Sequence, residues 1–157
     1  MLTHIKILAV GRRMPSWVND GIADYQKRMR DIRIEIVEIP QVKRTASQPP
    51  AKAMERECGK LLSVMPADAH LVALDQSGSP LSSKQLAAQL EQWMQNHQSV
   101  AFMIGGSDGL DDRCKKASHA IWSLSNMTLP HALARLMLVE QLYRAWTILK
   151  DHPYHRG

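Results

Sequence analysis

The sequence predicts an α/β fold, in which a largely parallel sheet is flanked by helices, and two observations carry that prediction. Short apolar runs of about four to eight residues alternate along the chain with longer segments whose apolar residues recur at helical spacing. Turn-forming glycine, proline, serine and asparagine stand between most of these segments. Strands that alternate with helices form parallel sheets, and the ligands of such sheets gather at the carboxyl ends of the strands.

The expected strands are residues 5–10, 32–39, 70–74, 100–104 and 120–124. The first strand is closed by Gly11, and the alternating isoleucines of the second are stopped by Pro40. A turn is expected at residues 77–80, where serine, glycine and proline cluster, and a loop is expected at residues 41–50.

The expected helices are residues 15–30, 51–65, 82–97 and 131–150, with a short additional helix opened by Asp111 and Asp112. Ser82 or Ser83 is the expected N-cap of the third helix, because a serine hydroxyl can accept a hydrogen bond from a free backbone N–H. Three residues of the first helix have the spacing of an inward face: Trp17, Ile22 and Tyr25.

The chain has 157 residues and is 45% hydrophobic, which is enough for one well-buried core and short for two. No internal repeat, low-complexity tract or linker divides it, so we expect a single domain over residues 1–157. The N-terminus lacks the regions of a signal peptide, and no apolar run approaches the roughly 18 residues of a membrane span. A cytoplasmic protein with no membrane partner is therefore expected.

The two cysteines, Cys58 and Cys114, lie far apart in the sequence and form no Cys-x-x-Cys motif. In a cytosolic protein this arrangement favours free thiols over a disulfide or a metal pair. No metal site is expected elsewhere, because the histidines lack further cysteines or carboxylates at ligand spacing.

Positive charge is concentrated in the first part of the chain. The formal net charge is +5, and residues 1–60 hold 12 Lys and Arg against 7 Asp and Glu, whereas residues 61–157 hold 8 of each. A clustered basic surface would bind RNA phosphates in a salt-dependent manner, and a solvated helix face with a flexible loop is the alternative. The candidate RNA contacts are Arg12, Arg13, Lys27, Arg28, Arg30, Arg33, Lys43 and Arg44.

The last expected helix is apolar nearly all round. One stripe comprises Leu138, Leu142, Ala145 and Leu149, flanked by Val139 and Trp146, and the opposite face carries Leu133, Leu136, Met137 and Tyr143. A helix that is apolar on both sides must be covered on both sides. We therefore expect one face to pack on the sheet and the other on a second subunit, with complete burial inside one chain as the alternative.

The last third of the chain concentrates glycine and polar residues at expected strand ends. The strand 100–104 ends at Gly105-Gly106, and glycine permits a close approach of the backbone to a ligand or to a second chain segment. After the strand 120–124, Ser125, Asn126 and Thr128 can hydrogen-bond a ligand before a proline opens the last helix.

These sequence motifs follow one another along nearly the whole chain, and together they resemble the RlmH family of SPOUT-class RNA methyltransferases. The resemblance also rests on Val10-Gly11, Met14-Pro15-x-Trp17, the strand 34–40 with Lys43-Arg44 after it, Leu74-Asp75 and Leu142-Tyr-Arg-Ala-Trp146. It implies an enzyme that uses S-adenosylmethionine to methylate a pseudouridine of 23S ribosomal RNA at ring nitrogen 3, on the assembled ribosome.

The resemblance further implies a homodimer and a C-terminal trefoil knot that forms the cofactor site, although ordinary topology rules would argue against a knot. His131 is expected beside the cofactor as the first residue of the last helix, not as a base. The cofactor-binding residues that the resemblance implies are Leu74, Gly105, Leu124, Ser125, Asn126, Met127, Thr128 and Leu129.

The tail supplies groups that suit the target base. His155 can move a proton near neutral pH, Arg156 can bind a phosphate or stabilise a developing anion, and Tyr154 can stack or donate a hydrogen bond. Arg144 stands one helical turn from Glu140, so an ion pair is the alternative to a catalytic role. For His155 the alternative to a catalytic role is that the terminus is disordered or is held in place for structural reasons. The candidate catalytic residues are thus His155, Arg156, Tyr154 and Arg144.

Two rival functions remain at this point. A non-catalytic ribosome-binding factor would need the basic first sixty residues but neither the glycine-ended strand nor the reactive tail. A SPOUT methyltransferase that acts on tRNA would share the cofactor segment and carry other substrate elements.

Overall fold

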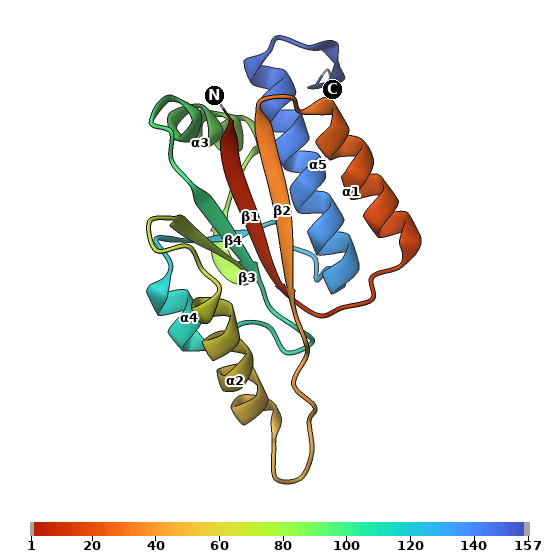
Figure 1. Cartoon of the computed structure of the whole chain (residues 1–157), viewed down its shortest axis with the longest axis vertical. Helices are drawn as coiled ribbons and strands as arrows, with labels where there is room; N and C mark the ends of the chain where they lie inside the picture. Colours follow the sequence, from red (N-terminus) through yellow and green to blue (C-terminus); the bar gives the residue numbers. More distant parts are fainter. Residues whose placement is uncertain (1, 156–157) are drawn as a thin grey trace.

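Five parallel strands form one sheet in the order β2-β1-β4-β3-β5 (Figure 1). The strands are β1 (Thr3–Val10), β2 (Ile32–Ile39), β3 (His70–Pro80), β4 (Val100–Ile104) and β5 (Ala120–Ser123). The helices are α1 (Ser16–Arg28), α2 (Pro50–Ser63), α3 (Ser83–Gln95), α4 (Asp112–Ala117) and α5 (His131–Leu149), followed by a 3-10 turn (Pro153–His155). This computed structural model describes residues 2–155. The expected α/β fold with a parallel sheet is confirmed.

Helices cover both faces of the sheet. Alternate residues of β1 point to opposite sides, so Ile5 and Ile7 pack with α1, α3 and α5, whereas Leu8 and Val10 pack with α2 and α4. The central strand β4 is buried along its whole length, which explains its uninterrupted apolar sequence. The trefoil knot that the resemblance implies remains a prediction.

Local signals set the starts of two helices as expected. The Ser82 hydroxyl accepts a hydrogen bond from the Gln85 backbone N–H, and the Gln85 side chain accepts one from the Ser82 N–H, which completes a capping box for α3. The Asp111 carboxylate caps α4 by accepting from the Arg113 N–H.

Two expectations about local structure were wrong. Residues 77–80 do not form a turn but continue β3, which shifts register after Leu74 and pairs again with β5 through Ser79 and Pro80. Gly78 makes this possible, because a Cβ there would lie 2.7 Å from the backbone carbonyl carbons of β5. Trp17 does not face inward: it is 53% exposed, while Ile22 is buried and Tyr25 half-buried.

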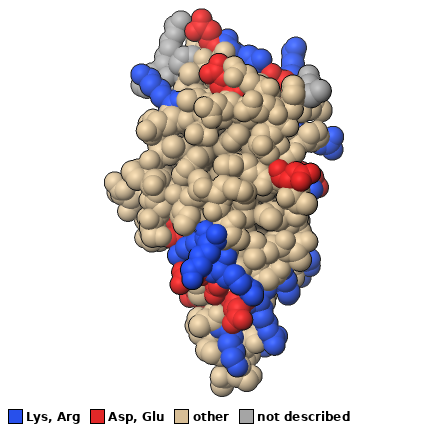
Figure 2. Space-filling model, turned by 90° about the vertical axis from the view of Figure 1, so that its left-hand side faces the viewer, with Lys and Arg blue, Asp and Glu red and all other residues tan. Residues whose placement is uncertain are grey.

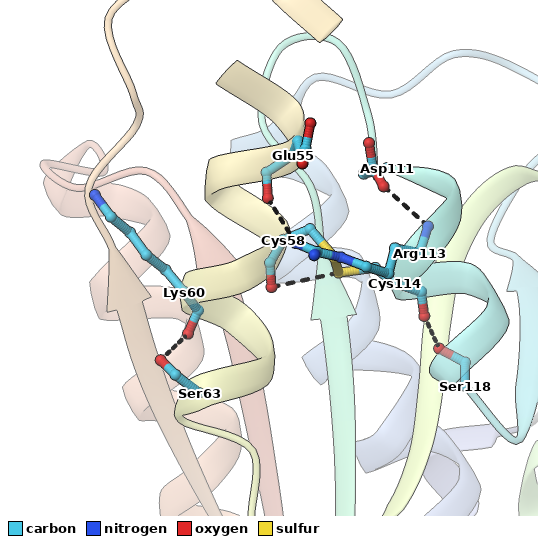
Figure 3. Close-up of a disulfide and its surroundings, with 8 residues drawn as sticks. All are labelled: Glu55, Cys58, Lys60, Ser63, Asp111, Arg113, Cys114 and Ser118. Carbon is cyan, nitrogen blue, oxygen red and sulfur yellow. Dashed lines mark hydrogen bonds between the residues drawn. A yellow bond between two sulfur atoms is a disulfide. The ribbon is translucent and has the colours of Figure 1, made fainter. Parts of the chain in front are cut away.

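The expectation of free thiols is also corrected, because Cys58 of α2 and Cys114 of α4 form a disulfide (Figure 3). Both helices cover the same face of the sheet and bring the two Cα atoms within 5.7 Å of each other. The sequence separation of 56 residues carries no information about this pairing.

The last helix buries its main apolar stripe within its own chain. Leu138, Leu142 and Ala145 are fully buried against the sheet, α1 and α3, so they do not face a second subunit. On the opposite side, Leu133 is 42% exposed and Met137 half-buried. None of the helices within residues 2–155 is long and apolar enough to cross a bilayer.

Candidate active site

A cavity of about 530 Å³ opens at the carboxyl ends of β3, β4 and β5. Its volume suits a small-molecule ligand, and its position is the one expected for a parallel α/β sheet. The wall comprises residues 74–77, 104–109, 123–125 and 127–129, together with Lys115, His131 and Ala134.

The structure brings together most of the residues expected to bind the cofactor. The cavity is lined by Leu74, Gly105, Leu124, Ser125, Met127, Thr128 and Leu129. Asn126 is exposed and does not line the cavity, although its two neighbours do. The segment between β5 and α5 therefore supplies five residues of the wall.

Short hydrogen bonds fix the shape of this segment. The Ser123 hydroxyl donates to the Ser125 carbonyl at 2.9 Å, and the Ser125 hydroxyl accepts from the Met127 N–H at 2.9 Å. The Gln76 amide nitrogen, on the extension of β3, donates to the Thr128 hydroxyl at 2.7 Å. The Met127 side chain itself is 77% exposed, so its backbone and not its side-chain packing shapes this wall.

Gly105 serves a close approach between two parts of the chain. A Cβ on Gly105 would lie 2.8 Å from the Leu110 nitrogen and still closer to the Gly109 carbonyl. Residues 106–109 turn back on themselves, and the Gly109 N–H donates to the Gly106 carbonyl at 3.1 Å. The sequence left open whether this glycine allows the approach of a ligand or of a second chain segment, and the structure shows the approach of a chain segment.

Two carboxylates stand at the cavity wall, those of Asp108 and Asp75, and the second follows directly after the buried part of β3. The Asp75 carboxylate accepts hydrogen bonds from the Ser77 N–H at 3.0 Å and from the Ser77 hydroxyl, and the Lys115 ammonium lies 3.4 Å away. Burial alone would raise the pKa of Asp75, but the Ser77 hydrogen bonds and the Lys115 charge outweigh it and lower the pKa. The wall thus carries an ionised carboxylate.

A buried polar relay connects the cavity to the ends of β1 and β2. The Arg135 side chain is 1% exposed and donates to Glu38 at 2.7 Å, to the Gly11 carbonyl at 3.3 Å and to His131 Nε2 at 3.0 Å. His131 Nδ1 in turn donates to the Gly105 carbonyl at 2.9 Å. The relay therefore joins the carboxyl ends of three neighbouring strands.

These contacts select one form of His131. The Gly105 carbonyl can only accept and the Arg135 guanidinium can only donate, so the ring is neutral and carries its proton on Nδ1. Burial lowers the pKa of His131, the bond to the Gly105 carbonyl opposes this in part, and the Arg135 charge lowers the pKa further. The expectation that His131 is a helix-start residue beside the cavity agrees with its position.

A second ion-pair cluster attaches the loop after β2 to the cavity wall. Arg44 contacts both carboxylate oxygens of Glu57, which is buried on α2, and reaches Asp108 at 3.0 Å. The Val42 N–H also donates to Glu57 at 3.0 Å, and Gln41 donates to Ser107 at 3.1 Å. Arg44 was a candidate RNA contact, but its guanidinium is engaged inside the protein; the adjacent Lys43 is exposed.

Two of the candidate catalytic residues meet on the second half of α5. The Tyr154 hydroxyl lies 3.2 Å from a Glu140 carboxylate oxygen and 3.4 Å from the Tyr25 hydroxyl. Arg144 pairs with Glu140 at 3.2 Å, as its spacing predicted, and its guanidinium carbon lies 5.1 Å from the centroid of the Tyr154 ring. The His155 side chain and Arg156 lie outside the described part of the chain.

The environment of Tyr154 keeps its hydroxyl protonated. Burial, the hydrogen bond with Tyr25 and the charge of Glu140 all raise the pKa of Tyr154. In this cluster Tyr154 is therefore a hydrogen-bond donor and not a base.

The tail cluster, formed by Tyr154, Tyr25, Glu140 and Arg144, and the cavity lie at different positions along α5. His131, the first residue of the helix, lines the cavity, whereas Tyr154 contacts Glu140 and Arg144 in the second half of α5. The 9 to 13 residue steps from His131 to these two residues correspond to about 14–20 Å along the helix axis. A tail held in this position does not reach the cavity of its own chain.

A parallel sheet with a ligand-sized cavity at its carboxyl edge is typical of α/β proteins that bind small molecules. The chain belongs to the SPOUT methyltransferase family, because the family described as predicted SPOUT methyltransferases matches residues 3–155.

Relatives over nearly the whole length support the same family. A protein of Hahella chejuensis named "Ribosomal RNA large subunit methyltransferase H" is 46% identical and covers 98% of this chain and 99% of the relative. A Janthinobacterium protein of the same name is 47% identical over the same shares. The solved structure of a probable methyltransferase from Bordetella pertussis shares the fold at a TM-score of 0.58, with 18% identity over 92% of this chain and 94% of that one.

The buried ionic residues of the site were not predicted from the sequence. Arg135 and Glu57 are the clearest omissions, since both are almost fully buried and both hold other parts of the wall. A signal was present for Arg135, which interrupts the apolar helix one turn after His131; a charge at such a position requires a partner. Glu57 and Glu38 carried no comparable signal, because their burial and pairing depend on distant segments.

Proposed function

We propose that this chain is an S-adenosylmethionine-dependent methyltransferase that modifies a pseudouridine of 23S ribosomal RNA at ring nitrogen 3, on the assembled ribosome in the cytoplasm. One observation carries the proposal: in a member of the SPOUT family, the segments expected to hold the cofactor surround one cavity at the carboxyl edge of the sheet. The names of the relatives supply the RNA class. The chain acts as one domain, whose C-terminal part is knotted.

The wall fits the proposed cofactor. Leu74, Leu124 and Leu129 offer apolar surface for a purine, and the backbone of residues 105–106 and 124–129 offers hydrogen-bonding groups. The ionised Asp75 and the neutral His131 are compatible with a ligand that carries positive charge, whereas a protonated histidine would repel it. S-adenosylmethionine supplies an activated methyl group, so the protein has to orient the base and assist removal of its N3 proton.

The groups that handle the base come from the tail. Tyr154 donates a hydrogen bond or stacks, Arg144 and Arg156 bind phosphate or stabilise negative charge on the base, and His155 accepts the proton. Because the tail cluster is displaced along α5 from the cavity of its own chain, these groups serve the cavity of a second subunit. Exposed Leu133 and half-buried Met137 offer apolar surface for the homodimer contact.

The deciding experiment compares three substrates. Purified protein and radiolabelled S-adenosylmethionine are incubated with intact ribosomes, free 23S RNA and tRNA, and the modified nucleoside is identified by mass spectrometry. Methylation of ribosomes at a pseudouridine is expected. Modification of tRNA alone would replace the proposal by the tRNA alternative, and a failure to bind S-adenosylmethionine in calorimetry would leave a non-catalytic ribosome-binding factor.

A further inference from the structure

A straight row of positive charges runs along the outer face of α2. Lys52, Arg56 and Lys60 are spaced by four residues, so they lie above one another on the helix, about 6 Å apart. All three are exposed. Within residues 2–155 none of them takes part in a salt bridge.

The neighbouring helix α4 widens this row into a basic ridge, which we define as Lys52, Arg56, Lys60, Arg113 and Lys116. Figure 2 shows Lys and Arg side chains, with some Asp and Glu side chains between them, on the lower half of the face that holds α2 and α4, below a broad area with little charge.

Few acidic groups compensate the ridge. Among the nearby carboxylates, Asp111 caps α4 and Asp112 lies 3.9 Å from Lys115. Together with Lys115 the ridge carries six positive charges against the three negative charges of Glu55, Asp111 and Asp112, so a positive excess of three remains.

The ridge is a rigid surface. The Cys58–Cys114 disulfide joins α2 to α4, and the Arg113 guanidinium donates to the Glu55 carbonyl at 3.1 Å (Figure 3). The two helices that carry the five charges are thus held together before any partner binds, which reduces the entropy lost on binding.

The inner side of α4 contributes one residue to the wall of the cavity, and the inner side of α2 is connected to the wall through an ion pair. Lys115 of α4 pairs with Asp75, and Glu57 of α2 holds Arg44, which reaches Asp108. A polyanion that lies along the ridge therefore passes beside the mouth of the cavity.

We propose that the basic ridge binds the phosphate backbone of the RNA substrate and positions the target segment at the cavity. This inference rests on the proposed function for the identity of the polyanion. Regular spacing along one helix fits a chain of phosphates better than the irregular charges of an acidic protein surface.

The test compares two triple variants with the wild-type protein. K52Q/R56Q/K60Q removes the charges, K52R/R56K/K60R keeps them, and Lys84→Gln on the exposed face of α3 controls for lost charge elsewhere. We expect the glutamine variant alone to raise KM for ribosomes at least about tenfold near 0.1 M salt. In the same variant, the slope of log RNA affinity against log salt concentration should become less steep by about 2 to 3. S-adenosylmethionine affinity and Tm should stay within error for all variants.

Binding of 23S RNA fragments, measured by fluorescence anisotropy without cofactor, separates this inference from the proposed function. Lost RNA affinity in the glutamine variant supports the ridge even if no methylation is detected. Unchanged affinity and salt dependence in that variant would overturn the ridge while leaving the methyltransferase proposal intact. Equal losses in the charge-keeping variant, or stronger binding to anionic vesicles than to RNA, would also overturn it.

Discussion

Gly105 and Gly106 provide a matched pair of substitutions at the end of β4. Both sit in the cavity wall, and neither has a positive φ, so an alanine at either position is free of backbone strain. The two differ in what a Cβ would meet. On Gly105 it would collide with the backbone of Gly109 and Leu110, whereas on Gly106 it would lie 3.1 Å from a Val10 methyl carbon.

The structure gives the size of the two effects. Overpacking by a methyl costs about 1–3 kcal/mol, and Gly105→Ala should reach the upper end, because a backbone neighbour cannot rotate away. At about 2–4 °C per kcal/mol for a chain of this length, Tm should fall by about 6–12 °C. Gly106→Ala should change the unfolding free energy by less than about 1 kcal/mol, since the Val10 side chain can yield and alanine restricts the unfolded chain.

Urea unfolding followed by circular dichroism measures the stabilities, and calorimetry with S-adenosylmethionine measures binding. Gly105→Ala should lose both stability and cofactor affinity, because the displaced loop 106–109 forms part of the wall. Equal stabilities of the two variants would refute the close approach of β4 to this loop. A fully stable Gly105→Ala protein that binds no cofactor would instead assign the glycine to direct contact with the ligand.

Three further predictions concern the dimer, the tail and His131. Leu133→Glu should convert a dimer to a folded monomer in light scattering, whereas Leu142→Glu should prevent folding, because Leu142 is fully buried in its own chain; a wild-type protein that is already monomeric would contradict the dimer. Deleting residues 152–157 should leave dimerisation and cofactor affinity intact but lower methyl transfer at least about a hundredfold. Heterodimers of this deletion with the cofactor-site variant Gly105→Ala should recover part of the activity, and no recovery in proven heterodimers would exclude a shared site. His131 has a folded-state pKa below its ordinary value, so its contribution to stability is present above the unfolded-state pKa near 6.5 and is lost as pH falls through the folded-state pKa. His131→Asn should flatten the dependence of unfolding free energy on pH in that acidic range, and an unchanged slope would show that the ring titrates freely in the folded protein.

Strand and cap positions were predictable because they depend on neighbouring residues. The bounds of β2 and β4 agree with those expected from alternating or continuous apolar runs, and Ser82 caps α3 as expected. For the same reason the segments of the cavity wall could be named in advance: glycine and polar residues at strand ends are visible in the sequence, and parallel strands bring those ends to one edge. Whether each named residue contacts the cofactor stays a prediction.

The incorrect predictions, those for residues 77–80 and for Trp17, share a different physical origin. The continuation of β3 through residues 77–80 requires β5 as a pairing partner, and the exposure of Trp17 depends on how α1 lies against α5. Both features override local propensity through contacts between segments that are distant in the sequence.

The α/β fold, the order of its elements and the segments that surround the cavity are predictable from the sequence, because each follows from periodicity and from residues a few positions apart. The folded chain alone shows which charges are buried in pairs, which cysteines meet, and where the tail packs along α5. Those outcomes depend on distances between segments brought together by packing. Arg135 shows the difference, since nothing near it in sequence names Glu38 and the Gly11 carbonyl as its partners.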